Sequence, residues 1–543
     1  MYQIKCVHCF KSIEERSVLF QLDEIMSSLD EMDSDSVSTD NSTIDTIESD
    51  SISKKSKISG GMGGKRRRNV NSGSQKQTIS FEQTGDYLCL KPYFENGTVE
   101  VKDTLLWNVY SIEIGNKKYS GVIDLKSVTR FCPFCKNKII KDAGACKIIN
   151  IGMIGHQSAG KTVYLTIQDY ILFYSSREQL DNIVGVPGGK LYFQGEFSHI
   201  RNADKIEETE IYKASKRVLD EQKLPDPTSS IPDPYCLRVE YREEKSKKNL
   251  THCVICFRDI LGEVFTNQDI DEAMRRLVTN YLRESDAILL FTDPEAFSLN
   301  SEVGINHDFQ IKYTIMRNNI DRVFSIFDGA VPKPSLCMIT KEDILAEYAA
   351  NKIGKLSRIE SSSLMIAEAV SMNYQESIDE DIDMYKNFYS LSEATKKGMK
   401  DIVSGCWWDV MLDTYFSESV YVPISSIGRK CRIFEQQYLV DAESYLLLER
   451  KKMDAQENNE KYEVTKNDTA GALDVLNPRF ITLPLMYFLE KFDIIPPIYT
   501  QKSYHTVEQI IRKGFLGFGR EVETIIEFDQ DVYDKWVIKH SEG

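Results

Sequence analysis

The feature that most constrains this chain is the octapeptide over residues 155–162, which fits the pattern G-x-x-x-x-G-K-[ST]. An apolar run over residues 148–154 precedes it, and an apolar helical pattern runs from Val163 to about Tyr174. A strand, a glycine-rich turn and a helix form the context that this motif requires, because backbone N–H groups can then wrap around phosphates at a helix N-terminus. The sequence therefore predicts a nucleoside triphosphate site. Its expected ligands are Gly155, Gln157, Ser158, Ala159, Gly160, Lys161, Thr162 and Val163, with the Lys161 charge on the β- and γ-phosphates and the Thr162 hydroxyl on Mg²⁺.

The rest of the chain alternates strand patterns with helical ones. Strands are expected near residues 148–154, 237–241, 253–257, 287–292, 335–340 and 420–425. This alternation predicts an α/β fold with a mainly parallel sheet and helices on both faces. The predicted domain covers residues 147–500, with large helical insertions at about 166–235 and 344–420 and an extension over 501–543.

A second motif supplies a carboxylate at the end of a strand. Asp259 follows the apolar segment over residues 253–257 and begins a D-x-x-G turn that ends at Gly262. We expect Asp259 to help hold Mg²⁺ and the Gly262 N–H to contact the γ-phosphate. Glu263 comes next, and it either orients the attacking water or merely caps the following helix. A further Mg²⁺ ligand is expected from Thr228, although its loop is equally compatible with no ligand role.

A third motif predicts which base is bound. Thr340, Lys341 and Asp343 belong to a T-K-x-D sequence at a strand end. An aspartate here can accept hydrogen bonds from the two adjacent donors of guanine, which adenine does not offer, while the lysine stem stacks on the base. The segment over residues 423–428, where the last strand ends, resembles the loop of guanine-nucleotide-binding proteins whose backbone contacts the guanine carbonyl. The resemblance implies Ser425, Ser426 and Ile427 as its contact residues.

Two C-x-x-C pairs predict a structural metal site. The pairs are Cys6 with Cys9 and Cys132 with Cys135, and together they offer four thiolates, the tetrahedral set that suits Zn²⁺. The long separation between the pairs leaves open the alternative of unrelated free thiols.

The N-terminal region divides by composition into three predicted parts. Residues 1–26 would form the first half of a zinc-ribbon-like module, and residues 78–146 a β-rich segment that carries the second pair of cysteines. Residues 27–77 are first acidic and then basic, and such a composition predicts a disordered linker. The basic cluster over residues 65–68 is open to an anionic partner but is more typical of a solvated linker.

Composition limits the remaining function classes. The net charge of −16 argues against a general nucleic-acid-binding protein, although nucleic acid remains a possible partner. No run reaches the about 18 apolar residues of a membrane span, and no apolar signal-peptide core follows Met1. We therefore expect a cytoplasmic protein that has no membrane contact.

The motifs in this order resemble the signature elements of the TRAFAC-class P-loop GTPases. Residues 149–162 are similar to the P-loop of translation factors. The total pattern is closer to the bacterial double-GTPase and zinc-ribbon GTPase-like families of conflict (defence) systems, which carry an N-terminal zinc ribbon, a D-x-x-G-E turn and a late proline-containing segment like residues 478–485 here.

The resemblance implies that Lys161, Gly262 and Glu263 serve GTP hydrolysis. It also implies GTP/GDP, Mg²⁺ and Zn²⁺ as cofactors, and a protein partner that reads the nucleotide-dependent loops. The resulting hypothesis is a slow GTPase that acts as a nucleotide-dependent switch, and the resemblance places this switch in a bacterial defence system. A non-hydrolysing nucleotide-binding scaffold and a P-loop ATPase are the alternatives.

Overall fold

The computed structural model divides the chain into two compact units, each described by itself. The larger unit comprises residues 1–12 and 142–543, and the smaller unit comprises residues 13–141. The structure describes residues 2–14, 17–21, 30–31, 78–84, 86–90, 108–114, 117–124, 128–155, 159–174, 195–199, 209–226, 233–242, 249–260, 272–293, 317–342, 388–403, 407–428, 430–435, 437–458, 461–465, 468–476, 478–496, 504–512, 521–528 and 530–541.

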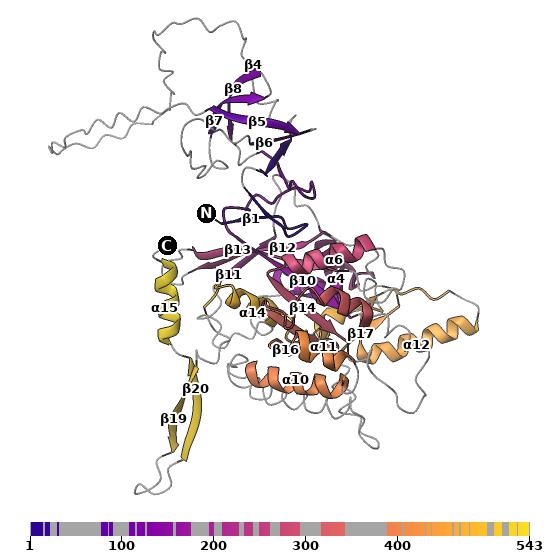
Figure 1. The fold of residues 1–543 in the computed structure, drawn as a ribbon. Coiled ribbons are helices and arrows are strands. Elements are labelled where there is room, and N and C mark those ends of the chain that lie inside the picture. The colour runs from indigo at the N-terminus through magenta and orange to yellow at the C-terminus, as the bar shows by residue number, and fades with distance from the viewer. Residues whose placement is uncertain are drawn as a thin grey trace, which may run out of the picture. The chain divides into compact units, whose positions relative to one another are not determined.

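A seven-stranded sheet forms the centre of the larger unit, with the strand order β11-β12-β13-β10-β14-β15-β16 (Figure 1). Strands β13, β10, β14, β15 and β16 are parallel, whereas β11 and β12 are antiparallel to their neighbours. The strands are β10 (Lys147–Gly155), β11 (Gly195–His199), β12 (Tyr235–Arg242), β13 (Asn249–Asp259), β14 (Ala287–Thr292), β15 (Ser335–Ile339) and β16 (Val420–Pro423).

The burial of the central strand β10 indicates that the sheet is covered on both faces. All its residues after Lys147 are buried. Such a continuously buried strand is typical of parallel sheets with helices on both faces. Ile151 pairs with Phe257 on β13 and with Ala287 on β14, so β10 has a parallel neighbour on each side.

The order of the strands makes β10 a topological switch point. From β10 the chain passes to β12 and β13 on one side, and from β13 it crosses to β14 on the other. Right-handed connections that leave a strand in opposite directions place their helices on opposite faces of the sheet. In such sheets the crevice at the carboxyl ends of the strands beside the switch point is where ligands bind.

Helices fill the connections of the larger unit. They are α2 (Lys161–Tyr174), α4 (Glu210–Glu221), α6 (Glu272–Glu284), a helix over 317–324, α10 (Phe388–Val403), α11 (Trp407–Tyr415), α12 (Ala442–Glu457), α13 (Ala472–Val475), α14 (Leu483–Lys491) and α15 (Gln530–Ser541). Asp169 of α2 is fully buried, and it accepts hydrogen bonds from Ser215 of α4 and, at 2.7 Å, from Tyr235 of β12. These bonds satisfy the carboxylate and join two helices to the sheet.

Two late helices complete the core of the larger unit. Residues 483–490 of α14 are all buried, so this helix is enclosed around its whole circumference, and all of them except Glu490 are apolar or aromatic. The C-terminal helix α15 contacts the sheet through Trp536, whose ring lies edge-on to Tyr241 with the centroids 5.3 Å apart. The Trp536 indole N–H donates to Asp493 at 2.8 Å, just after α14. Two hairpins lie outside the sheet, namely β17 (Cys431–Phe434) with β18 (Tyr438–Asp441), and β19 (Tyr504–Arg512) with β20 (Glu521–Phe528).

The smaller unit is rich in β-structure. Its sheet has the order β4-β8-β7-β5-β6-β3-β9 and is antiparallel except where β5 pairs with β7. The strands are β3 (Leu19–Gln21), β4 (Asp30–Glu31), β5 (Thr78–Thr84), β6 (Tyr87–Leu90), β7 (Asn108–Ile114), β8 (Lys117–Asp124) and β9 (Arg130–Phe131). The short strands β1 (Ile4–Lys5) and β2 (Ser12–Ile13) pair with each other at the start of the chain.

The predicted fold class is confirmed: the chain is α/β with a mainly parallel sheet and carries a β-rich N-terminal module. The domain boundaries stay predictions. The predicted linker over residues 27–77 lies outside the described residues except for residues 30–31. The insertion predicted near 344–420 is described only where it forms α10 and α11 and their flanks.

Candidate nucleotide site and cysteine cluster

The phosphate loop begins where β10 ends, at the switch point of the sheet. Gly155 is packed so closely that a Cβ atom there would lie 2.8 Å from Phe291 Cβ and 2.9 Å from the Phe291 carbonyl oxygen. Gly160 has a φ of +86°, in the left-handed region that favours glycine. The sequence therefore needs glycine at both ends of the loop, for close packing at the first position and for backbone conformation at the second.

Lys161 is the first residue of α2, and its side chain is buried. The Lys161 ammonium donates to the Gly155 carbonyl oxygen at 3.0 Å, so it folds back across the loop. Burial lowers the pKa of Lys161, and the nearby Asp259 carboxylate opposes that shift. A buried cation held over a glycine-rich loop is suited to a phosphate anion, which would compensate for its desolvation.

Thr162 and Asp259 meet beside this lysine. The Thr162 hydroxyl donates to Asp259 Oδ2 at 2.6 Å, and Asp259 is only 4% exposed. Parallel pairing of β10 with β13 places Asp259 opposite Met153, close to the start of the loop. Burial raises the pKa of Asp259, while Lys161 and the Thr162 hydrogen bond oppose the rise. A hydroxyl and a carboxylate oxygen side by side are hard ligands of the kind that Mg²⁺ prefers.

The carboxyl end of β15 carries the residues predicted to read the base. The Thr340 N–H donates to the Thr292 carbonyl at the end of β14, at 2.9 Å. Lys341 has a left-handed backbone with φ of +57°, and its ammonium lies 2.6 Å from Asp293 Oδ2. Asp293 is buried and was not predicted from the sequence. The only signal for it was a carboxylate directly after an apolar strand.

The loop after β16 lies next to this segment. The Ile424 N–H donates to the Ile339 carbonyl at 2.7 Å, and the Glu342 N–H donates to the Ile424 carbonyl at 3.0 Å. Ser425 is fully buried, and its hydroxyl accepts from the Gly428 N–H at 2.9 Å, which closes the turn that contains Ser426 and Ile427. The structure thus brings the two loops predicted to hold the base together at the carboxyl ends of β15 and β16.

Arg479 connects these two loops and was missed by the sequence analysis. Its backbone forms a two-way bridge with Ser425, with N···O distances of 2.8 and 3.2 Å. Its guanidinium lies 3.2 and 3.3 Å from the two carboxylate oxygens of Glu342, and both side chains are buried. The residue precedes α14 by a few positions, and nothing local in the sequence indicates a partner 137 residues away.

Several predicted site residues lie outside the described residues. They are Gln157, Ser158, Thr228, Gly262, Glu263 and Asp343. Ala159, by contrast, is described and buried, and Val163 packs against the core next to Thr162. The described part of the site therefore includes the strand ends and the first turn of α2.

The four cysteines of the C-x-x-C pairs form one cluster. The sulfur atoms of Cys6, Cys9, Cys132 and Cys135 all lie within 4.8 Å of one another. Cys6 and Cys132 are fully buried, whereas the second cysteine of each pair is half-buried. Four thiols gathered this closely match the donor set of a structural Zn²⁺ site.

The two cysteine turns have the same backbone geometry. The N–H of Phe10 donates to the Cys6 carbonyl at 2.8 Å, and the N–H of Lys136 donates to the Cys132 carbonyl at 2.9 Å. Phe10 and Lys136 both adopt left-handed backbones, with φ of 64° and 61°. The His8 N–H lies 3.4 Å from the Cys6 sulfur, and the Asn137 side-chain amide lies 3.6 Å from the Cys135 sulfur. Such N–H donors stabilise thiolates bound to a metal.

Among the helices that the structure describes, none combines the length and apolar character needed to cross a membrane.

Comparison with known proteins gives similarity only to solved structures. No family model matches the sequence, and no curated protein matches it. Elongation factor SelB from Methanococcus maripaludis, in complex with the GTP analogue GppNHp, aligns with 59% of this chain at 12% identity and a TM-score of 0.18. The septin GTPase domain from Chlamydomonas reinhardtii aligns with 42% at 12% identity and a TM-score of 0.18. Era in complex with MgGDPNP and a 16S ribosomal RNA segment aligns with 73% at 12% identity and a TM-score of 0.17.

The chain spans 35% of the SelB chain, 61% of the septin domain and 89% of Era. TM-scores this low do not establish a common fold, so the assignment depends on the strand order and the loop sequence of this chain. A mainly parallel sheet with a G-x-x-x-x-G-K-T loop at its switch point is the architecture of a P-loop nucleotide-binding fold.

Proposed function

We propose that this chain binds GTP with Mg²⁺ and hydrolyses the GTP slowly, as a nucleotide-dependent switch. The observation that carries the proposal is the hydrogen bond from Thr162 to the buried Asp259 beside the buried Lys161. When no ligand is bound, burial of two opposite charges and a hydroxyl at a strand end costs free energy. A bound phosphate and cation would offset that cost.

In this proposal the phosphates lie in the loop between Gly155 and Thr162. The Lys161 ammonium exchanges its bond to the Gly155 carbonyl for one to the β- and γ-phosphate oxygens. The N–H groups of the loop residues, Gln157, Ser158, Ala159 and Gly160 among them, and of the first turn of α2 point at the same anion. A negative ligand would return the pKa of Lys161 toward its ordinary value, because it stabilises the charged form.

Thr162 and Asp259 would hold Mg²⁺, with Thr228 as a further ligand. Their oxygen atoms are already in hydrogen-bond contact, so the donor set fits a hard cation without a large rearrangement of the described residues. Bound there, the cation supplies charge neutralisation at the β- and γ-phosphate oxygens.

Hydrolysis would depend on the D-x-x-G turn after β13. We assign the Gly262 N–H to the γ-phosphate and the Glu263 carboxylate to orientation of the attacking water. A carboxylate in that position also repels the γ-phosphate, and the intrinsic rate is therefore expected near or below about 10⁻³ s⁻¹, the range of unassisted GTPases. A protein partner that supplies a cationic group would accelerate the reaction.

Base recognition would use both loops that Arg479 connects. Asp343 accepts from the two adjacent guanine donors, and the stem of Lys341 stacks on the base while Asp293 holds its ammonium. The backbone of Ser425, Ser426 and Ile427 contacts the guanine carbonyl. The described bonds between the loops support this arrangement, because they fix the two walls of a base pocket relative to each other.

We further propose that the cysteine cluster holds a structural Zn²⁺ and that the chain belongs to the zinc-ribbon GTPase-like proteins of bacterial conflict systems. The equal geometry of the two cysteine turns and the buried α14 after Pro478 support this assignment. Its test is protection of a bacterial host against a panel of phages. Wild type should protect, and Lys161→Ala should not.

The nucleotide proposal is tested by competition. Fluorescent GTP is bound to the protein in Mg²⁺ and displaced with unlabelled GTP, ATP or XTP, for wild type and for Asp343→Asn. GTP should displace the probe, ATP should not, and the variant should shift toward XTP. Equal displacement by ATP, with no effect of the substitution, would instead identify a P-loop ATPase. Tight binding with turnover no faster than the uncatalysed background would identify a non-hydrolysing scaffold.

A further inference from the structure

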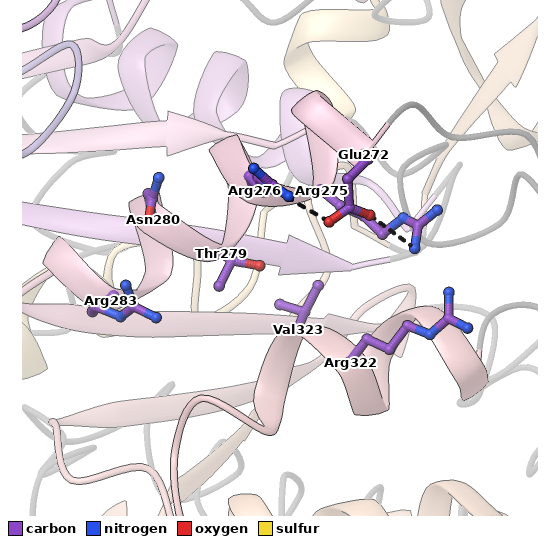
Figure 2. A pocket seen from close by; sticks show the side chains of 8 residues that line it. All are labelled: Glu272, Arg275, Arg276, Thr279, Asn280, Arg283, Arg322 and Val323. Atoms are coloured by element: carbon purple, nitrogen blue, oxygen red, sulfur yellow. Dashed lines mark hydrogen bonds and ion pairs between the residues drawn. The ribbon is translucent and has the colours of Figure 1, made fainter.

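An open groove of about 580 Å³ lies between α6 and the helix over residues 317–324 (Figure 2). Arg275, Arg276 and Arg283 line it from α6, and Arg322 lines it from the facing helix. We call this site the arginine groove. None of the predicted nucleotide-site residues that the structure describes is among the residues that line it.

The periodicity of α6 produces this arrangement. Arg276, Asn280 and Arg283 recur at helical spacing on one face, while Val278 and Leu282 are buried on another. The two outer arginines of this stripe are about 10 Å apart along the helix axis, given the rise of about 1.5 Å per residue. The stripe therefore offers two guanidinium groups at separate points along one groove.

The groove is strongly positive in an acidic chain. Among the lining residues that the structure describes, four are arginines and one, Glu272, is a carboxylate, while the whole chain carries a net charge of −16. Glu272 lies 3.4 Å from Arg275 and 3.3 Å from Arg276 (Figure 2). Within the part of the chain that the structure describes, neither Arg283 nor Arg322 forms an ion pair.

This concentration of charge does not serve the fold. Exposed ion pairs such as those of Glu272 contribute little stability, and uncompensated like charges around one cavity repel each other. A ligand that carries several negative charges would relieve the repulsion, and guanidinium groups bind carboxylates with two parallel hydrogen bonds. Charge complementarity thus identifies the occupant as an anion.

Apolar surface in the groove distinguishes between anions. The lining includes Val323 and the aliphatic stems of the four arginines beside their charged groups. Arginine with adjoining apolar surface is typical of protein interfaces, whereas a nucleic-acid backbone or a free phosphate gains nothing from an apolar contact. We propose that the arginine groove docks an acidic segment of a partner protein in which carboxylates alternate with apolar residues. The proposal does not depend on which nucleotide the chain binds.

The test uses the full chain and a rhodamine-labelled synthetic peptide, Glu-Asp-Leu-Glu-Asp-Leu-Glu, followed by fluorescence anisotropy. Wild type should bind it saturably, and binding should weaken as salt is raised, because exposed charges are screened. The double variant Arg276→Glu/Arg283→Glu should bind at least about tenfold more weakly, since it removes two charge-assisted contacts and adds repulsion. Both side chains are exposed, so the fold should tolerate the exchange.

Two controls make the result specific. Arg450→Glu makes the same exchange at an exposed position of α12 outside the groove, and it should leave binding unchanged. The matching peptide with lysine in place of each acidic residue should bind the double variant more tightly than it binds wild type. Rescue by this charge exchange would not follow from a merely structural effect of the substitutions.

Three outcomes would overturn the proposal. The first is the lack of saturable peptide binding by wild type, and the second is equal weakening by Arg450→Glu. The third is that a thymidine oligonucleotide or inorganic phosphate binds wild type more tightly than the peptide does and loses this binding in the double variant. Displacement of fluorescent GTP is measured on the same samples, so a failure of the nucleotide proposal would be recognised separately.

Discussion

Substitution of either member of the Glu342–Arg479 ion pair should lower the stability of the larger unit and weaken nucleotide binding at the proposed base site. Glu342 is 1% exposed and Arg479 is 7% exposed, so neither charge is solvated. Arg479 also pairs through its backbone with Ser425, and Glu342 bonds through its N–H to Ile424. The pair therefore holds together the two loops assigned to the base.

The magnitude follows from the geometry. At an effective dielectric constant of about 20, opposite unit charges 3.2 Å apart attract by roughly 5 kcal/mol. Most of that attraction offsets desolvation in the intact pair, but a single substitution leaves the other buried charge without this ion-pair partner. Arg479→Met or Glu342→Gln should therefore lower the free energy of unfolding by about 3–5 kcal/mol. The double variant Glu342→Leu/Arg479→Met should be less destabilised than Arg479→Met alone.

The assay measures two quantities for the same proteins. The midpoint of thermal unfolding reports the stability, and the dissociation constant of fluorescent GTP reports the base pocket. We expect the single substitutions to weaken GTP binding by about tenfold or more, corresponding to 1.4 kcal/mol or more. The hydrolysis rate at saturating GTP should stay near that of wild type, because neither side chain lies among the predicted phosphate ligands.

The control is Lys461→Met, which removes an ion pair of 2.9 Å to Glu463 where both side chains are more than 70% exposed. Such a pair should contribute at most about 1 kcal/mol. If Arg479→Met changed unfolding and GTP affinity no more than this control does, the Glu342–Arg479 pair would not be the connection that fixes the loops.

Three further predictions concern the remaining parts of the site. Gly155→Ala should lower the free energy of unfolding by about 1–3 kcal/mol and weaken GTP binding, because the new methyl group would lie 2.9 Å from the backbone oxygen of Phe291. An unchanged midpoint of thermal unfolding would contradict this packing. Asp259→Asn should make GTP binding far less dependent on Mg²⁺, which a titration of fluorescent GTP with and without EDTA would measure, whereas an unaltered dependence would place the cation elsewhere. Cys132→Ser should lower the bound zinc, measured by elemental mass spectrometry, from one atom per chain toward none, and retention of a full equivalent would exclude the four-cysteine site.

Local sequence patterns predicted the elements that depend on local physics. The apolar run of β10, the glycine turn and α2 are adjacent in the chain, so this strand, turn and helix could be predicted without any knowledge of tertiary contacts. The phosphate loop, the strand ends at Asp259 and Thr340 and the class of the sheet all follow from such patterns. The parallel pairing of β5 with β7 in the smaller unit was not predicted, because contacts between segments distant in the chain decide which strands become neighbours.

The same local patterns did not predict the residues that hold the motif residues in place. Phe291 fixes the space around Gly155, Asp293 holds the ammonium of Lys341, and Arg479 holds the carboxylate in the variable position of T-K-x-D. Each lies far along the chain from the residue it contacts, and each becomes its neighbour only through the order of β10, β14, β15 and β16. A motif specifies which atoms face the ligand, whereas the strand order specifies which buried groups hold those atoms in place. Substitution of the supporting residues should therefore alter affinity and stability together, while substitution of an exposed ligand-facing residue should alter affinity alone.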